Sequence, residues 1–115
     1  PYANGSIHLG HLLEAVQTDV YVRARRLMGD DVVFVWADDA HGTPIQVRAL
    51  KEGITPEALV ARAYEEHVSV YRDFQISFDV YHSTHSEENR RHAEHVWSSL
   101  QSKGDIDARS IEQLY

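Results

Sequence analysis

The chain opens on the segment that most constrains its fold, Pro-Tyr-Ala-Asn-Gly-Ser-Ile-His-Leu-Gly-His (Pro1–His11). It predicts a turn that leads directly into a helix, with His8 and His11 on one face because they are three residues apart. Main-chain N–H groups at a helix N-terminus attract anions, and histidines there add further donors. Gly10 has no side chain, so a flat base or a sugar can approach its backbone closely. The segment favours binding of a nucleoside triphosphate.

The rest of the chain alternates between helical and strand patterns. In chain order we expect a helix between His8 and Met28, a buried strand over Val32–Trp36, helices over Ile45–Glu52 and from Thr55 to about Phe74, a strand over Ile76–His82, and a helix from Ser86 to Gly104. Such alternation is typical of an α/β protein with a parallel sheet and right-handed crossovers. Because the opening segment connects a strand to a helix, we expect a further strand before Pro1. Residues 105–115 are ambiguous and suggest an edge strand and a turn.

Local signals predict where the helices begin. Thr43 and Thr55 each precede a proline, which predicts an N-cap followed by proline at the first helical position. Ser86 is expected to cap the last helix, and Thr84 with Glu87 also fits a capping box.

A second polar loop, Ala37–Pro44, follows the first predicted strand. Ligands of parallel sheets lie beyond the carboxyl ends of the strands, so we expect this loop to open onto the same crevice as Pro1–His11. Its adjacent carboxylates, Asp38 and Asp39, are suited to a metal ion or an ammonium group. The alternative is that one of them only caps the following turn.

No metal site is predicted elsewhere. His82 and His85 are interpreted as polar loop residues because they lie between a strand end and a helix cap. His92 and His95 share a helix face, but no obvious third ligand accompanies them, and we assign them to the helix surface.

Composition excludes several classes of protein. Of the 115 residues, 11 are Lys or Arg and 18 are Asp or Glu, and the net charge of −7 argues against a general nucleic-acid-binding surface. There is no cysteine, which excludes disulfides and thiolate metal sites and is compatible with a reducing cytoplasm. No apolar run approaches membrane-spanning length. We therefore expect a cytoplasmic protein with no membrane partner.

The two polar loops together resemble motifs of the class I aminoacyl-tRNA synthetases, and of the methionyl-tRNA synthetases in particular. His-Leu-Gly-His at residues 8–11 resembles the H-I-G-H region of the class, and the preceding Pro-Tyr-Ala-Asn-Gly occurs in methionyl and isoleucyl enzymes. Asp-Ala-His-Gly-Thr at residues 39–43 is similar to the D-x-H-G-T pattern of methionyl enzymes; isoleucyl and leucyl enzymes have G-W-D-x-x-G-x-P instead. The resemblance continues through residues 81–89 and covers essentially the whole chain.

The resemblance implies a fold and a division of the chain. It implies the N-terminal part of the catalytic domain, which is the first half of a Rossmann-like parallel sheet with flanking helices and with its first strand missing. Residues 1–104 would belong to this partial domain, and residues 105–115 would begin the connective-peptide insertion. The family's K-M-S-K-S loop, cysteine zinc knuckles and anticodon-binding domain are not in this chain. The resemblance allows zinc in the intact protein, bound by such knuckles, but this chain holds no ligands for it.

The resemblance also implies an activity. The family joins methionine to ATP, supplied with Mg²⁺ as the substrate, and transfers the methionyl group to tRNA(Met). Six residues carry roles over from the family's motifs: His8 and His11 on the ATP phosphates and ribose or base, Gly10 against adenine, Asn4 on the reacting phosphate, Tyr2 in the methionine pocket and Asp39 on the substrate ammonium group. His8, His11 and Asn4 would be the catalytic residues.

Two other functions are compatible with the first motif alone. Small nucleotidylyltransferases also use H-x-G-H, but they do not need the D-x-H-G-T motif. The chain is also compatible with a non-catalytic nucleotide-binding fragment. If the chain is instead part of a methionyl enzyme, we expect the 115 residues by themselves not to form methionyl-adenylate.

Overall fold

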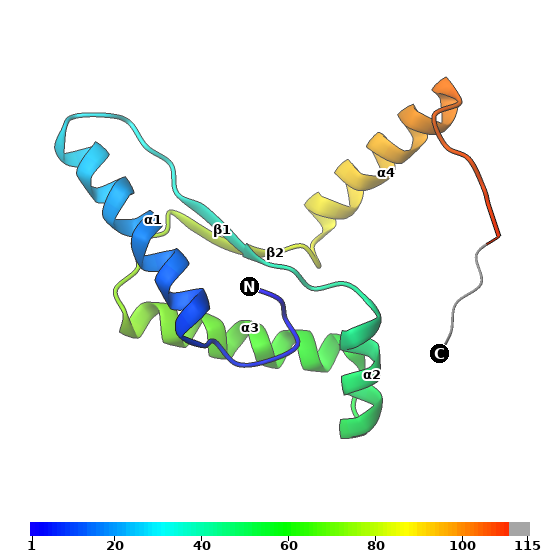
Figure 1. Ribbon diagram of the computed structural model, residues 1–115, viewed down its shortest axis with the longest axis horizontal. Coiled ribbons are helices and arrows are strands. Elements are labelled where there is room, and N and C mark those ends of the chain that lie inside the picture. Colours follow the sequence, from blue (N-terminus) through cyan, green and yellow to red (C-terminus); the bar gives the residue numbers. More distant parts are fainter. Residues whose placement is uncertain (111–115) are drawn as a thin grey trace. The chain divides into compact units, whose positions relative to one another are not determined.

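The computed structural model describes residues 1–110, which fall into two compact units, one over Pro1–His85 and one from Ser86 onward (Figure 1). The elements in chain order are α1 (Leu9–Leu27), β1 (Val35–Asp38), α2 (Thr43–Glu52), α3 (Pro56–Asp73), β2 (Val80–Ser83) and α4 (Glu87–Lys103). The first unit holds α1 to β2 and both polar loops. Residues 105–110 have no regular structure, and the rest of the edge strand and turn predicted for 105–115 lies outside the described residues.

The helix boundaries largely follow local signals. Thr55 and Ser86 cap α3 and α4 as predicted, because each side chain accepts the main-chain N–H three residues later, in both cases at 3.2 Å. Gly53 and Gly104 end α2 and α4 in the left-handed conformation, with φ of 67° and 77°.

Two of the predicted helix starts are wrong. The N-cap of α2 is Gly42 and not Thr43, so the helix begins at Thr43 without a side-chain cap. The N-cap of α4 is Ser86 and not Thr84, whose hydroxyl accepts the N–H of Ala40 at 2.8 Å. Tertiary contact with the loop after β1 has therefore taken precedence over the local pattern.

The sheet is parallel, as predicted, and α2 and α3 lie in the crossover between its strands. Val35 pairs with Val80, and the register continues to Asp38 and Ser83. β1 nevertheless begins three residues later than predicted. The Asp79 carboxylate accepts the N–H of Phe34, so side chains satisfy part of the main chain where a longer strand was expected.

The opening segment joins the sheet. Asp39, directly after β1, donates its N–H to the carbonyl of Pro1 at 2.7 Å and accepts the N–H of Ala3 at 2.8 Å. On the neighbouring residue, Asp38, the main-chain carbonyl accepts the N–H of Thr84. Main-chain groups of adjacent strand residues face opposite edges, so the opening segment and Thr84 lie on opposite edges of the chain at this point. The parallel bridge between Tyr2 and Asp39 thus places the opening segment beside β1.

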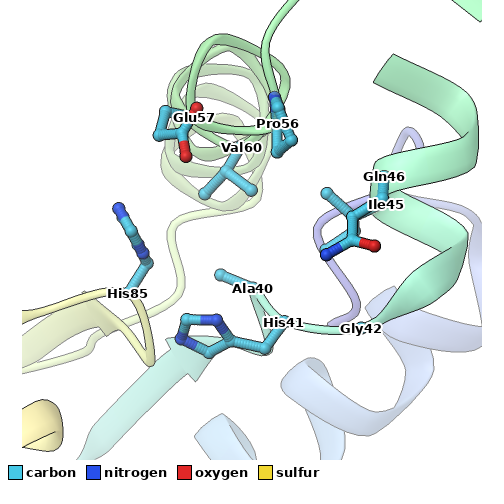
Figure 2. A pocket seen from close by; sticks show the side chains of 9 residues that line it. All are labelled: Ala40, His41, Gly42, Ile45, Gln46, Pro56, Glu57, Val60 and His85. Atoms are coloured by element: carbon cyan, nitrogen blue, oxygen red, sulfur yellow. The ribbon is translucent and has the colours of Figure 1, made fainter. Parts of the chain in front are cut away.

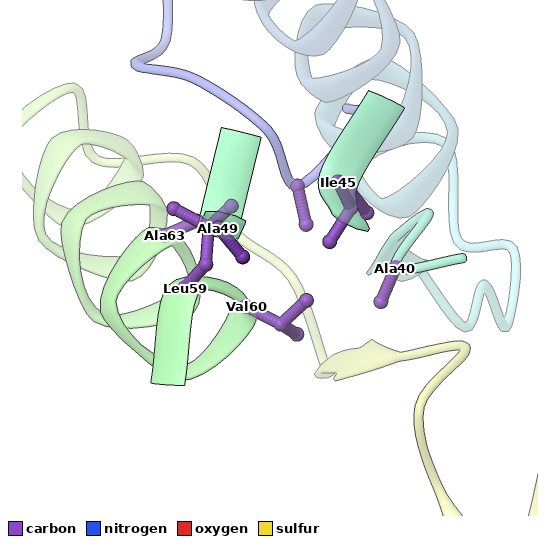
Figure 3. Close-up of a cluster of buried hydrophobic side chains, with 7 residues drawn as sticks. Ala40, Ile45, Ala49, Leu59, Val60 and Ala63 are labelled. Atoms are coloured by element: carbon purple, nitrogen blue, oxygen red, sulfur yellow. The ribbon is translucent and has the colours of Figure 1, made fainter. Parts of the chain in front are cut away.

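The core of the first unit lies between the opening segment, α2 and α3. Its buried apolar side chains are Ala3, Ala40, Ile45, Ala49, Leu59, Val60 and Ala63 (Figure 3). Small side chains let the two helices and the loop approach closely. The second unit has no buried side chain on α4, where Trp97 is 57% exposed.

Candidate functional site

The two polar loops meet at the carboxyl end of β1, as the sequence predicted. The bridge between Tyr2 and Asp39 joins them through their main chains, while the Asp39 side chain is exposed. Since both main-chain groups of Asp39 are hydrogen-bonded, its carboxyl group is presented to solvent from a fixed backbone.

Tyr2 lies against Gly42 in the second loop. A Cβ atom on Gly42 would lie 2.8 Å from the Tyr2 hydroxyl oxygen, closer than side-chain atoms approach one another. The φ of Gly42 is also +125°, a conformation that side chains disfavour. The backbone conformation of Gly42 therefore favours glycine, and a Cβ there would also displace the Tyr2 hydroxyl.

His8 and His11 form a capping box at the start of α1. Nδ1 of His8 accepts the N–H of Gly10 at 3.1 Å, and Nδ1 of His11 accepts the N–H of His8 at 3.4 Å. The rings stack with centroids 3.7 Å apart. A neutral imidazole that accepts at Nδ1 carries its proton at Nε2, so both rings offer an N–H donor on the side away from the helix backbone.

The protonation of His11 suits this role. Partial burial, and then the neighbouring His8, lower the pKa of His11 below its ordinary value. The ring of His11 is therefore neutral near pH 7 and keeps its Nδ1 acceptor.

Asp38 is buried, in contrast to its neighbour Asp39. Its Oδ1 atom lies 2.8 Å from Nδ1 of His67 and also accepts the hydroxyl of Tyr81. The alternative that Asp38 only caps the following turn does not hold, because its hydrogen-bond partners come from α3 and β2. Its Oδ2 atom is buried with no hydrogen-bond partner among residues 1–110. The carboxyl group therefore depends on His67 and Tyr81.

His67 links this buried carboxyl group to the opening segment. Its ring is fully buried, and Nε2 lies 2.7 Å from the carbonyl oxygen of Gly5. Burial alone lowers the pKa of His67, but hydrogen bonds to Asp38 and Gly5 outweigh it and leave the pKa above its ordinary value. A carbonyl only accepts, so Nε2 carries a proton.

Asn4 is held from α2. Arg48 donates from Nη1 to the Asn4 carbonyl, and its Nε donates to Glu52 at 2.7 Å. The main chain of Asn4 also bonds back to Tyr2 at 2.8 Å. Two helices thus fix consecutive carbonyls of the opening segment, α2 at Asn4 and α3 at Gly5.

A cavity of about 170 Å³ is lined on one side by the loop residues 40–42. Figure 2 shows Glu57 and Val60 approaching it from α3, and His41 and His85 from the loops that follow β1 and β2. The rings of His41 and His85 have centroids 5.5 Å apart. None of the residues with predicted substrate roles lines this cavity.

Residues 1–110 show neither a metal-binding cluster nor a membrane-spanning helix. No group of three or more His, Cys, Asp or Glu side chains there is arranged to hold a metal ion. None of the helices among these residues is long and apolar enough to cross a membrane.

The sequence analysis missed His67, Arg48 and Tyr81 as contributors to this region. Their partners lie 29 to 62 residues away in the chain, so no local pattern connects them. One signal was present: His67 falls at helical spacing among the apolar residues of α3, where a polar side chain needs a buried partner.

The fold and the two loop motifs define the class of protein. The family described as tRNA synthetases class I (M) matches residues 1–115, and the chain belongs to it. This assignment decides against the small nucleotidylyltransferases. The Rossmann-like α/β fold class predicted from the sequence is confirmed by the structural neighbours.

Three curated relatives are methionine--tRNA ligases. The chain is 58% identical over all its residues to the methionine--tRNA ligase of Nitrosomonas eutropha, and 56% identical to those of Nitrosomonas europaea and Aromatoleum aromaticum. It spans 16% of the length of each of these relatives.

Solved structures agree in fold. A methionyl-tRNA synthetase of Mycobacterium tuberculosis bound by methionyl-adenylate has a TM-score of 0.86 and 28% identity, over 90% of this chain and 20% of that one. A LeuRS of Agrobacterium radiobacter K84, in a ternary complex with tRNA and LeuAMS, has a TM-score of 0.85 at 22% identity, over 90% of this chain and 13% of that one. The second likeness concerns the fold alone.

Proposed function

We propose that the complete protein carrying this chain activates methionine with ATP and transfers it to tRNA(Met). The family assignment and the methionine--tRNA ligases among its relatives support this function. The structural observation that carries it is the junction of the two loops. Asp39 lies beside Tyr2, near the start of the opening segment, and the same segment ends at the paired histidines.

In the proposed reaction a carboxylate oxygen of methionine attacks the α-phosphorus of ATP. The bond from that phosphorus to the bridging oxygen breaks, and pyrophosphate leaves. The 3′-terminal ribose hydroxyl of tRNA then attacks the methionyl carbonyl and AMP leaves. No protein nucleophile is needed, so the protein acts by orientation and by stabilising charge.

The histidine pair is assigned to the ATP phosphates. Nε2–H donors of His8 and His11, together with the positive end of the α1 helix dipole, would stabilise negative charge as it grows on the α-phosphate. Asn4 would hold the same phosphate. Gly10 has no side chain, and a Cβ there would lie 3.0 Å from the edge of the His8 ring. We assign the adenine to the exposed backbone of Gly10.

The methionine end of the substrate is assigned to Tyr2 and Asp39. The exposed carboxyl group of Asp39 would pair with the substrate ammonium group, and the ring of Tyr2 would line the pocket. We propose that other parts of the protein complete this site. Mg²⁺ would enter with ATP, and a cytoplasmic location fits the absence of cysteine in this chain.

The test is amino-acid-dependent exchange of labelled pyrophosphate into ATP by the complete purified protein. Methionine should support exchange, whereas isoleucine and leucine at equal concentration should support it weakly. Exchange with all three at similar efficiency, or with none of them, would contradict the proposal.

A further inference from the structure

One buried side chain bridges the two loops of the candidate site. His67, on α3, contacts Gly5 through Nε2 at 2.7 Å and Asp38 through Nδ1 at 2.8 Å. Gly5 follows Asn4 and lies three residues before His8, while Asp38 directly precedes Asp39. One ring nitrogen of His67 therefore contacts the residue after Asn4, which we assign to the phosphate. The other contacts the residue before Asp39, which we assign to the substrate ammonium group.

We propose that His67 is a positioning residue for adenylate formation, and that its bond to the Gly5 carbonyl holds the phosphate-binding segment in its reactive geometry. The proposal rests on the proposed function. Gly5 lies in a stretch with no regular secondary structure between the bridge at Tyr2 and the start of α1, so side chains must fix its backbone. Arg48 donates to the carbonyl of Asn4, whereas the carbonyl of Gly5 faces Nε2 of His67.

The two ring nitrogens have separable tasks. Asp38 keeps its hydrogen bond from Tyr81 and its place in the sheet when Nδ1 of His67 is lost. The Gly5 carbonyl has Nε2 of His67 as its side-chain donor. The Nε2 contact should therefore matter more for turnover, and the Nδ1 contact more for stability, because Nδ1 pairs a buried carboxyl group.

Two amide substitutions separate these tasks. The side-chain nitrogen of glutamine reaches the position of Nε2 and bonds Gly5, whereas that of asparagine reaches only the position of Nδ1 and bonds Asp38. We therefore compare His67→Gln and His67→Asn in the complete protein. Leu59→Ala serves as the control, because Leu59 is a buried residue of the same helix with no hydrogen bond to either loop.

The readouts are the melting temperature and the kinetics of methionine-dependent pyrophosphate exchange, with kcat expressed per folded molecule. We expect His67→Asn to lower kcat roughly ten- to a hundred-fold, the effect of a small displacement of reacting groups, with KM for methionine within about threefold of wild type. His67→Gln should keep kcat within about threefold, although it melts at a lower temperature than His67→Asn. Leu59→Ala should lower the melting temperature and leave kcat within the same range.

A purely structural role predicts another order. If kcat follows melting temperature across the three variants, or if both His67 variants keep wild-type kcat, the proposal is overturned. If His67→Gln does not fold, Asp38→Asn is combined with it to remove the unpaired buried charge, and the double variant is judged by the same kcat criterion. A wild-type protein that shows no methionine-dependent exchange contradicts the proposed function instead, and is thereby distinguished from a failure of this inference.

Discussion

The adjacent acids Asp38 and Asp39 allow a direct test of which carboxyl group meets the substrate. Asp39 is exposed with both main-chain groups bonded, so Asp39→Ala removes a side chain without disturbing the sheet. A charge-assisted hydrogen bond contributes about 1.5–3 kcal/mol. At tenfold per 1.4 kcal/mol, methionine binding should weaken roughly 10- to 150-fold. Stability should change by less than about 0.5 kcal/mol, as for an ordinary surface substitution.

Asp38→Ala is the matched comparison and should behave in the opposite way. It leaves the buried ring of His67 and the hydroxyl of Tyr81 without their shared acceptor, and breaking a buried pair costs about 3–5 kcal/mol. The assays on the complete protein are equilibrium dialysis with labelled methionine, the same experiment with ATP, and denaturant unfolding. ATP affinity should stay within about threefold of wild type in Asp39→Ala. Unchanged methionine affinity in Asp39→Ala would refute the assignment of Asp39 to the ammonium group.

Four further predictions concern His8, the isolated chain, His67 and Asp19. His8→Ala should lower the rate of methionine activation roughly 10²–10³-fold with methionine affinity nearly unchanged; if the whole effect falls on substrate affinity, His8 acts only in the ground state. The 115-residue chain alone should not catalyse pyrophosphate exchange, because its two-stranded sheet and many exposed apolar side chains leave the site poorly held; exchange within about tenfold of ordinary enzyme turnover would contradict this. The raised pKa of His67 contributes stability that is complete below about pH 6.5 and is lost as pH rises through the folded-state pKa. The free energy of unfolding should therefore fall over that range in wild type and not in His67→Gln, as measured by denaturant titrations between about pH 6 and 9. Asp19→Ala should cost about 1–3 kcal/mol in denaturant unfolding because buried Asp19 accepts both the N–H and the hydroxyl of Ser77, whereas Arg90→Ala should have a much smaller effect because solvent screens its exposed ion pair with Glu87.

Local chemistry in the sequence was sufficient for the helices. Thr55 and Ser86 cap their helices, and Gly53 and Gly104 end theirs, because a hydroxyl reaches an N–H within one turn and glycine accepts a positive φ at little cost. The parallel order of the strands followed from their alternation with helices. The meeting of the two loops followed in turn, since parallel strands end at the same edge.

Tertiary structure decided where the strands begin and which acid is buried. Strand pairing depends on a partner far away in the chain, and here side chains such as Asp79 replace the ladder where the apolar pattern predicted a strand. Asp38 and Asp39 are adjacent residues of the same type. Only the fold places His67 against Asp38 and leaves Asp39 exposed. A local pattern cannot encode this difference, because α3 brings His67 to Asp38 from 29 residues away.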